Sequence, residues 1–246
     1  MINLLLSLAV FAAIVAASRL AGFPLLAGLL PGTLAFVGMF FVLGRRVFTK
    51  LQNVMAEVQK ELSTLNANPR DQKVKMEKSV KLLEAALPLK SWQFLVEAEI
   101  MGQIGIIKFM FKDYAGAEAA FAKASSRNWL AQSMMAALAF QKKDWARMEA
   151  KWEEAVKHGK KEGMMWAGYA WCLLQNKEKD KALKVMARAV EANPSDEKLK
   201  GALTALQNDK KLKMKAWEPG WWQLGLEAPP QQQPMFVGGG GRRRFR

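Results

Sequence analysis

The chain has 246 residues, 51% of them hydrophobic, and its 37 Lys and Arg against 22 Asp and Glu give a net charge of +15. This length accommodates one globular domain and an additional segment, and the charge suits an anionic lipid, a nucleic acid or an acidic protein as partner. The single cysteine, Cys172, excludes an intrachain disulfide. One Cys and one His, His158, are too few for a zinc site of about four ligands, so no metal or cofactor is predicted.

Residues 1–46 are predicted to form a membrane-spanning helical hairpin. Arg19 is the only charged side chain among the first 43 residues, and apolar runs occupy residues 2–17 and 25–43. A spanning helix needs about 20 apolar residues, so the second run is long enough and the first is marginal. Backbone polar groups inside lipid must be satisfied internally, which makes a helix the expected structure of both runs, with a distortion at Pro31.

Two other interpretations of this segment stay open. The small residues of AIVAAS are compatible with a cleaved signal peptide, although MINLLL lacks the positively charged start of one. A short hairpin that enters the membrane without crossing it is also compatible with the pattern. For a complete hairpin, Arg45, Arg46 and Lys50 flank the second run, and no acidic residue occurs before Glu57. By the positive-inside rule, we expect an inner (cytoplasmic) membrane location with the rest of the chain in the cytoplasm.

Residues 47–66 continue the helical pattern as a stalk. Leu51, Val54, Val58 and Leu62 recur at steps of three and four residues, which places them on one face of a helix. This stripe is either a coiled-coil dimer seam or a surface that packs on the following domain. Barely two heptads favour the second interpretation.

A repeated pattern follows the stalk. The stretch KDYAGAEAAFAKA begins at Lys112, and KDWARMEAKWEEA begins 31 residues later at Lys143. In the first stretch a small residue, a large residue and an alanine stand at Ala117, Phe121 and Ala124, with three and then two residues between them. Both stretches resemble the second helix of a tetratricopeptide repeat, which is a helix pair of about 34 residues.

The resemblance covers residues 72–206 and implies an all-α solenoid of about three to four helix pairs, each of which needs neighbours to bury its apolar face. In such a solenoid small residues let helices approach closely, and a large residue fills the gap between pairs. The repeat-packing residues implied by the resemblance are Gly105, Ala117, Phe121, Ala124, Ala136, Trp152, Ala155, Trp166, Ala170, Ala182, Met186 and Ala189.

Polar residues mark where the helices of this region begin. Asp113 and Asp144 are expected to cap the second helices of two pairs. Ser195 is the expected N-cap of a closing helix that continues to Lys215.

The resemblance implies that the first helices line a concave groove, which in this family usually binds peptides or protein partners. The candidate groove residues are Met101, Ile106, Met134, Ala137 and Trp171. One version of the family clamps a partner's terminal carboxylate with basic and Asn residues. The matching positions here hold Gly102, Ile106, Ser133, Ala137, Ala167 and Trp171. A groove of this composition favours an apolar partner, or is covered by the protein itself.

Residues 207–246 are predicted to be a basic closing segment and a flexible tail, because the composition turns to Pro, Gln, Gly and Arg. Trp217, Trp221 and Trp222 either cap the last helix or dock at a membrane interface. The predicted contact with anionic lipid consists of Arg242, Arg243, Arg244, Phe245 and Arg246. RNA is the less favoured ligand for this tail.

No pattern of catalytic residues is evident. Cys172 lies between apolar neighbours with no nearby His, which is typical of a buried, unreactive thiol. The sequence therefore predicts a membrane-anchored scaffold for protein partners rather than an enzyme. The alternative is a structural subunit of a larger membrane complex that oligomerises through its hairpin and stalk, with Gly28, Gly32 and Ala35 at the contact. A tether for anionic lipid or nucleic acid ranks third.

Overall fold

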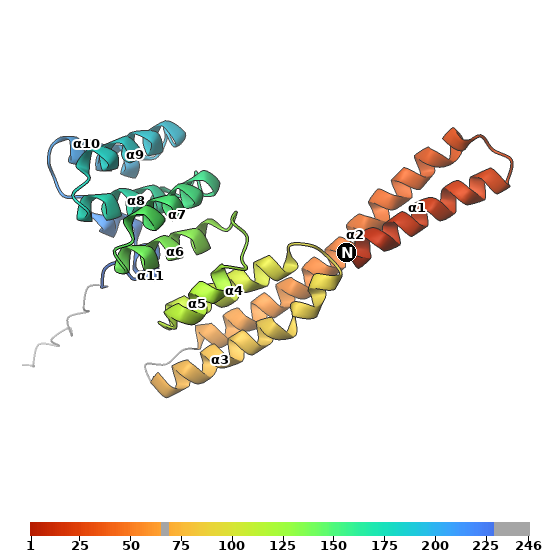
Figure 1. Ribbon diagram of the computed structural model, residues 1–246, viewed down its shortest axis with the longest axis horizontal. Coiled ribbons are helices and arrows are strands. Elements are labelled where there is room, and N and C mark those ends of the chain that lie inside the picture. Colours follow the sequence, from red (N-terminus) through yellow and green to blue (C-terminus); the bar gives the residue numbers. More distant parts are fainter. Residues whose placement is uncertain (65–68, 229–246) are drawn as a thin grey trace, which may run out of the picture.

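A computed structural model of the protein describes residues 1–64 and 69–228, and within these residues every regular element is a helix (Figure 1). The helices are α1 (Ile2–Leu20), α2 (Leu25–Ser63), α3 (Pro69–Ala85), α4 (Val96–Met110), α5 (Tyr114–Phe121), α6 (Trp129–Gln141), α7 (Trp145–His158), α8 (Gly163–Gln175), α9 (Lys179–Ala192), α10 (Glu197–Gln207) and α11 (Gly220–Gln223). Two 3₁₀ helices, η1 (Leu87–Ser91) and η2 (Met214–Trp217), complete the set. The all-helical class predicted from the sequence is confirmed.

Helices α1 and α2 form a projecting hairpin whose contact is made by small and polar residues (Figure 1). Asn3 and Ser7 are the buried residues of α1. On α2, a Cβ added to Gly28 would lie 2.9 Å from the Ser18 Cβ, and one added to Gly32 would lie 3.0 Å from the Phe11 ring. The glycines therefore permit close approach of two helices of the same chain, which is a use of this spacing that the sequence did not reveal.

The second half of α2 belongs to the helical body. The 39-residue helix continues through Pro31 without a break in its assigned range, and Val47, Leu51 and Val58 are 5–7% exposed. These three residues pack with Leu83 of α3 and Ile100 of α4 in one hydrophobic cluster. The described part of the predicted stalk, residues 47–64, therefore belongs to a core, and its apolar stripe packs within the chain as the favoured interpretation proposed.

Three helix pairs follow, α4–α5, α6–α7 and α8–α9, and all three are joined by the same turn. The residues in left-handed conformation at these turns are Lys112, Lys143 and Lys177, with φ of 64°, 57° and 63°. In the first turn the N–H of Asp113 donates to the Lys108 carbonyl oxygen and that of Lys112 to the Phe109 carbonyl oxygen, both at 2.9 Å. Equivalent pairs of bonds close the other two turns, so each first helix ends in a Schellman motif. The repeated Lys-Asp dipeptide marks the first two of these turns, and Lys177-Glu178 takes its place in the third.

The caps of the second helices agree with the prediction. The Asp113 carboxylate accepts from the Gly116 N–H at 3.0 Å, and the Asp144 carboxylate accepts from the Arg147 N–H at 3.1 Å. These bonds satisfy N–H groups that have no partner within the helix. Both aspartates are therefore N-caps in the structure.

Helix α10 differs from its prediction at both ends. Its N-cap is Asp196 rather than Ser195, because the Asp196 carboxylate accepts from the N–H groups of Lys198 and Leu199. The helix ends at Gln207 instead of continuing to Lys215. A fourth turn of the same type, with Asp209 at φ 56°, closes it. Helix α10 thus ends like the first helix of another pair, but the chain then turns back as η2 and α11.

Within the first pair, a glycine and an aromatic ring fit against each other. A Cβ added to Gly105 on α4 would lie 2.4 Å from the Phe121 ring of α5, closer than real Cβ contacts allow. A Cβ added to Gly168 on α8 would similarly lie 2.8 Å from the Trp152 ring. Bulky rings therefore occupy the space that the glycines leave on neighbouring helices.

We predict that Gly105→Ala destabilises the protein by about 1–3 kcal/mol, because the added methyl group overpacks the contact with Phe121. Gly201→Ala is the matched control, since a Cβ at Gly201 would have no atom within 4 Å. Removing a helix-interior glycine there should stabilise α10 by about 0.5–1 kcal/mol. Thermal unfolding in mild detergent, followed by circular dichroism, measures both effects. Equal shifts for the two variants would contradict the packing described.

Candidate functional site

The predicted repeat-packing residues lie almost entirely in the core. Those with no exposed surface are Ala117, Ala136, Trp152, Ala155, Ala170, Ala182, Met186 and Ala189. Phe121 and Trp166 are 2% and 4% exposed, and Gly105 is buried. The indole N–H of Trp166 donates to the Lys160 carbonyl oxygen at 3.0 Å, and the Arg188 guanidinium lies over its ring.

Ala124 departs from its predicted role. It follows the end of α5 at Phe121 and is partly exposed, instead of lying on the buried face of a second helix. The physical reason is the shortness of α5, which has 8 residues. Ala124 nevertheless lies near α4, since a Cβ added to Gly102 would lie 3.7 Å from the Ala124 Cβ.

The candidate groove residues do not form an open surface. Met134 and Ala137 have no exposed surface, and Trp171 is 9% exposed. Ile106 is partly buried against the same cluster, whereas Met101 packs against the separate cluster made with α2 and α3. Met101 and Ile106 are five positions apart and hence about 140° apart around α4, so the prediction that they share one groove is wrong.

The protein's own C-terminal segment, residues 214–228, covers the face lined by the first helices. Trp221 of α11 and Leu224 have no exposed surface, and Met214 of η2 is 4% exposed. The Trp221 ring meets Trp171 of α8 edge-on, with ring centroids 5.2 Å apart. This is a favourable aromatic geometry that also buries a large apolar area.

Polar contacts fix the segment on several helices. The Gln141 side chain, at the end of α6, donates to the Gly225 carbonyl oxygen at 3.2 Å. The indole N–H of Trp221 donates to the Glu227 carboxylate at 2.7 Å, which satisfies a polar group that burial would otherwise penalise. A Cβ at Gly220 would lie 2.7 Å from the sulfur of Met164 on α8, so the backbone approaches that helix closely. The segment therefore contacts both α6 and α8.

These contacts correct the prediction for the tail. Residues 216–228, which the prediction included in the flexible tail, are not a flexible extension, because Trp221 and Leu224 are buried in the core. Trp217 and Trp222 also pack against this core, which agrees with the alternative that the Trp residues cover the helices. Composition alone suggested a tail, since it does not record that two large apolar residues meet a complementary surface elsewhere in the chain. The predicted lipid-contact residues Arg242, Arg243, Arg244, Phe245 and Arg246 lie outside the described residues.

Ion pairs connect the helix pairs on their outer side. Glu118 of α5 contacts Lys142 at 2.7 Å and Arg147 of α7 at 2.6 Å. Glu153 of α7 forms a two-point contact with Arg188 of α9 at 2.8 and 2.9 Å. Hydrogen bonds from Arg188 lower the pKa of the Glu153 carboxyl below its ordinary value. Because these groups are partly exposed, each pair contributes little to the stability of the fold.

No catalytic chemistry follows from the thiol. Cys172 on α8 has no exposed surface, and burial raises its pKa to about 12. The thiol stays protonated at neutral pH and is a poor nucleophile. Within residues 1–64 and 69–228, no group of three or more His, Cys, Asp or Glu side chains is arranged to hold a metal ion.

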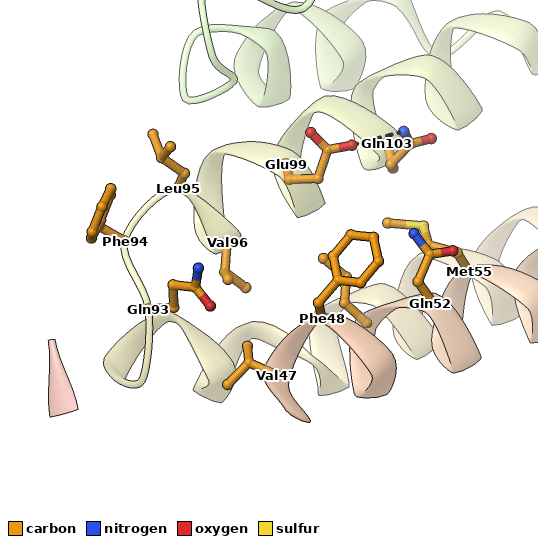
Figure 2. A pocket seen from close by; sticks show the side chains of 11 residues that line it. Val47, Phe48, Gln52, Met55, Gln93, Phe94, Leu95, Val96, Glu99 and Gln103 are labelled. Atoms are coloured by element: carbon orange, nitrogen blue, oxygen red, sulfur yellow. Dashed lines mark hydrogen bonds between the residues drawn. The ribbon is translucent and has the colours of Figure 1, made fainter. Parts of the chain in front are cut away.

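Sequence reasoning missed an apolar cleft of about 400 Å³ between α2 and the segment before α4 (Figure 2). Phe48 lies on one side, and Phe94 and Leu95 lie on the loop at the other, with exposed fractions of 58%, 51% and 65%. The available signal was the stretch SWQFL, which places large apolar residues between two helices. Large apolar side chains left exposed together are typical of an interaction surface.

Comparisons with models of protein families, with curated proteins and with solved structures found no match to the chain. The tetratricopeptide resemblance therefore rests on the residues quoted above and stays a hypothesis.

We predict that Trp221→Ala releases residues 214–228 from the helices beneath, because removing a buried Trp side chain costs about 3–5 kcal/mol. Faster amide hydrogen exchange is expected in this segment and along α8. Trp222→Ala is the matched control, since Trp222 is only partly buried. Unchanged exchange on α8 in the Trp221 variant would show that the segment does not protect this face.

Proposed function

We propose that the protein is a membrane-anchored scaffold that holds a helical body at the cytoplasmic face of the inner membrane for protein partners. The observation that carries this proposal is α2, which forms the hairpin with α1 at one end and packs in the body's core at the other. A helix shared in this way fixes the body directly to its anchor. No linker separates the two parts.

The hairpin buries small and polar residues and exposes large apolar ones, and this arrangement supports membrane insertion. Helices α1 and α2 are long and apolar enough to cross a membrane. Asn3, Ser7, Gly28 and Gly32 are buried, while the large apolar side chains point outward. Those at least 50% exposed between residues 5 and 41 are Leu5, Leu8, Leu20, Phe23, Leu25, Leu26, Leu30, Leu34, Val37 and Phe41. Water disfavours such a surface, whereas lipid favours it, and small residues at the contact are typical of membrane helices.

The side chains at the base of the hairpin support its orientation. Arg45, Arg46 and Lys50 are exposed on α2 directly after the apolar segment. The Asn3 N–H donates to the Trp92 carbonyl oxygen at 3.1 Å, so the loop that holds Trp92 and Phe94 lies at the start of α1. Trp is enriched at membrane interfaces, and basic residues are enriched on the cytoplasmic side.

The covered groove restricts how a partner binds. Trp221 and Leu224 occupy the apolar face that was the predicted binding surface. A partner that binds there has to supply apolar side chains that replace these two, and any other partner binds the outer surfaces of the helix pairs. The scaffold proposal therefore needs no permanently open groove.

The alternative of an oligomeric structural subunit has less support, because most of its predicted contact residues pack within the chain, although Ala35 is partly exposed. Gly28 and Gly32 face α1 of the same chain, and the stalk stripe packs on α3 and α4. Neither surface is free for a second copy. The scaffold is therefore the better-supported function.

Crosslinking in native membranes tests the proposal. We expect the full-length chain to resist alkaline extraction from membranes and to capture protein partners that mass spectrometry identifies. A chain of residues 1–64 is the matched control, which should stay in the membrane and lose those partners. Partners retained by residues 1–64 alone would instead support a subunit assembled through its hairpin. Recovery of the full-length chain in the soluble fraction would contradict anchoring.

A further inference from the structure

A second and larger cavity lies where the hairpin joins the body. Its volume is about 820 Å³, which is within the range of small-molecule binding sites. Side chains from three elements line it: Leu6 of α1, the 41–50 stretch of α2, and Leu89 with Trp92 at η1. The cavity therefore depends on α1 beginning beside η1 and α2, as the hydrogen bond from the Asn3 N–H to the Trp92 carbonyl oxygen shows.

Among the residues that the structure describes, the three cations that line this cavity have no carboxylate partner. Arg45, Arg46 and Lys50 line it, and no carboxylate lies within 4.0 Å of any of them among the described residues. The nearby Lys90, by contrast, pairs with Glu97 at 3.1 Å. Three exposed cations that lack carboxylate partners favour an anionic ligand.

Apolar residues line the part of the cavity nearer the hairpin, because Phe41 and Val42 come one turn of α2 before Arg45 and Arg46. Phe41 and Val42 line the cavity and are 66% and 47% exposed, and Leu6 is 41% exposed. Trp92 also lines it and is 39% exposed, as expected for a side chain with an apolar body and a polar N–H at an interface. A suitable ligand therefore has a negative charge joined to long apolar chains.

We propose that this cavity binds an anionic phospholipid, with the phosphate beside Arg45, Arg46 and Lys50 and the acyl chains along Phe41, Val42 and Leu6. The proposal rests on the membrane insertion proposed above, which brings the cavity to headgroup depth. Arginine is suited to this role because its guanidinium binds phosphate oxygens at two points. A free phosphate ion would leave the apolar wall unused.

Native mass spectrometry of the full-length protein tests the proposal, with phosphatidylglycerol as the anionic probe and phosphatidylcholine as the zwitterionic one, after reconstitution in phosphatidylcholine nanodiscs. We expect wild-type protein to retain phosphatidylglycerol preferentially. The double variant Arg45→Gln/Arg46→Gln should bind it about 25-fold more weakly, since each basic residue near an anionic lipid contributes about a factor of five. Lys73→Gln/Lys81→Gln removes the same charge from exposed positions on α3 and should change binding less than about twofold.

Each other outcome overturns the proposal. Equal binding of phosphatidylglycerol by the two double variants would show that net charge, not this cavity, attracts the lipid. Displacement of phosphatidylglycerol by millimolar inorganic phosphate would show a simple anion site. Failure of the wild-type chain to enter nanodiscs would contradict membrane insertion as well, whereas insertion without lipid preference would overturn this proposal alone.

Discussion

The hairpin and the helical body both depend on α2, because the residues that this helix exposes change along its length. From residue 25 to 42, α2 turns large apolar side chains outward and uses glycines where it meets α1. From Val47 to Val58 most of its apolar residues form a buried stripe that α3 and α4 cover, and Phe48 is the exposed exception. Arg45 and Arg46 lie at the change. Because an α-helix is stiff over this length, the direction of the hairpin determines where the body lies, and the cavity at their junction results from the same constraint.

The C-terminal segment completes the opposite end. Helix α10 ends in the turn that elsewhere leads to a second helix, but the chain returns across α8 and α6 instead. Stacked helix pairs need a final element that covers the last apolar face, and here Trp221 and Leu224 cover the face of the first helices as well. The basic residues between α10 and η2 remain exposed at this end. The face that was predicted to be a binding groove is therefore buried in the core.

Local patterns were sufficient for much of this structure. The helical class and the two apolar helices followed from residue spacing and composition, and the caps Asp113 and Asp144 followed from residue type. The specific residue pairings between distant segments were not predicted. The partner of Gly28 is a residue of α1, and the partner of Trp221 is Trp171, 50 positions earlier in the sequence. No periodic pattern in the sequence indicates either pairing, because each depends on how the shapes of two distant segments fit together.

Continuity of α2 is the central claim, and a distance measurement by pulsed electron paramagnetic resonance tests it most directly. Spin labels at Val37→Cys and Lys60→Cys, in a Cys172→Ala chain reconstituted in lipid, lie on exposed positions of the two halves. Twenty-three residues of uninterrupted helix separate them by about 35 Å. The account predicts a single narrow distribution near that distance. A broad distribution, or one centred well below it, would show a hinge between hairpin and body and would contradict the account.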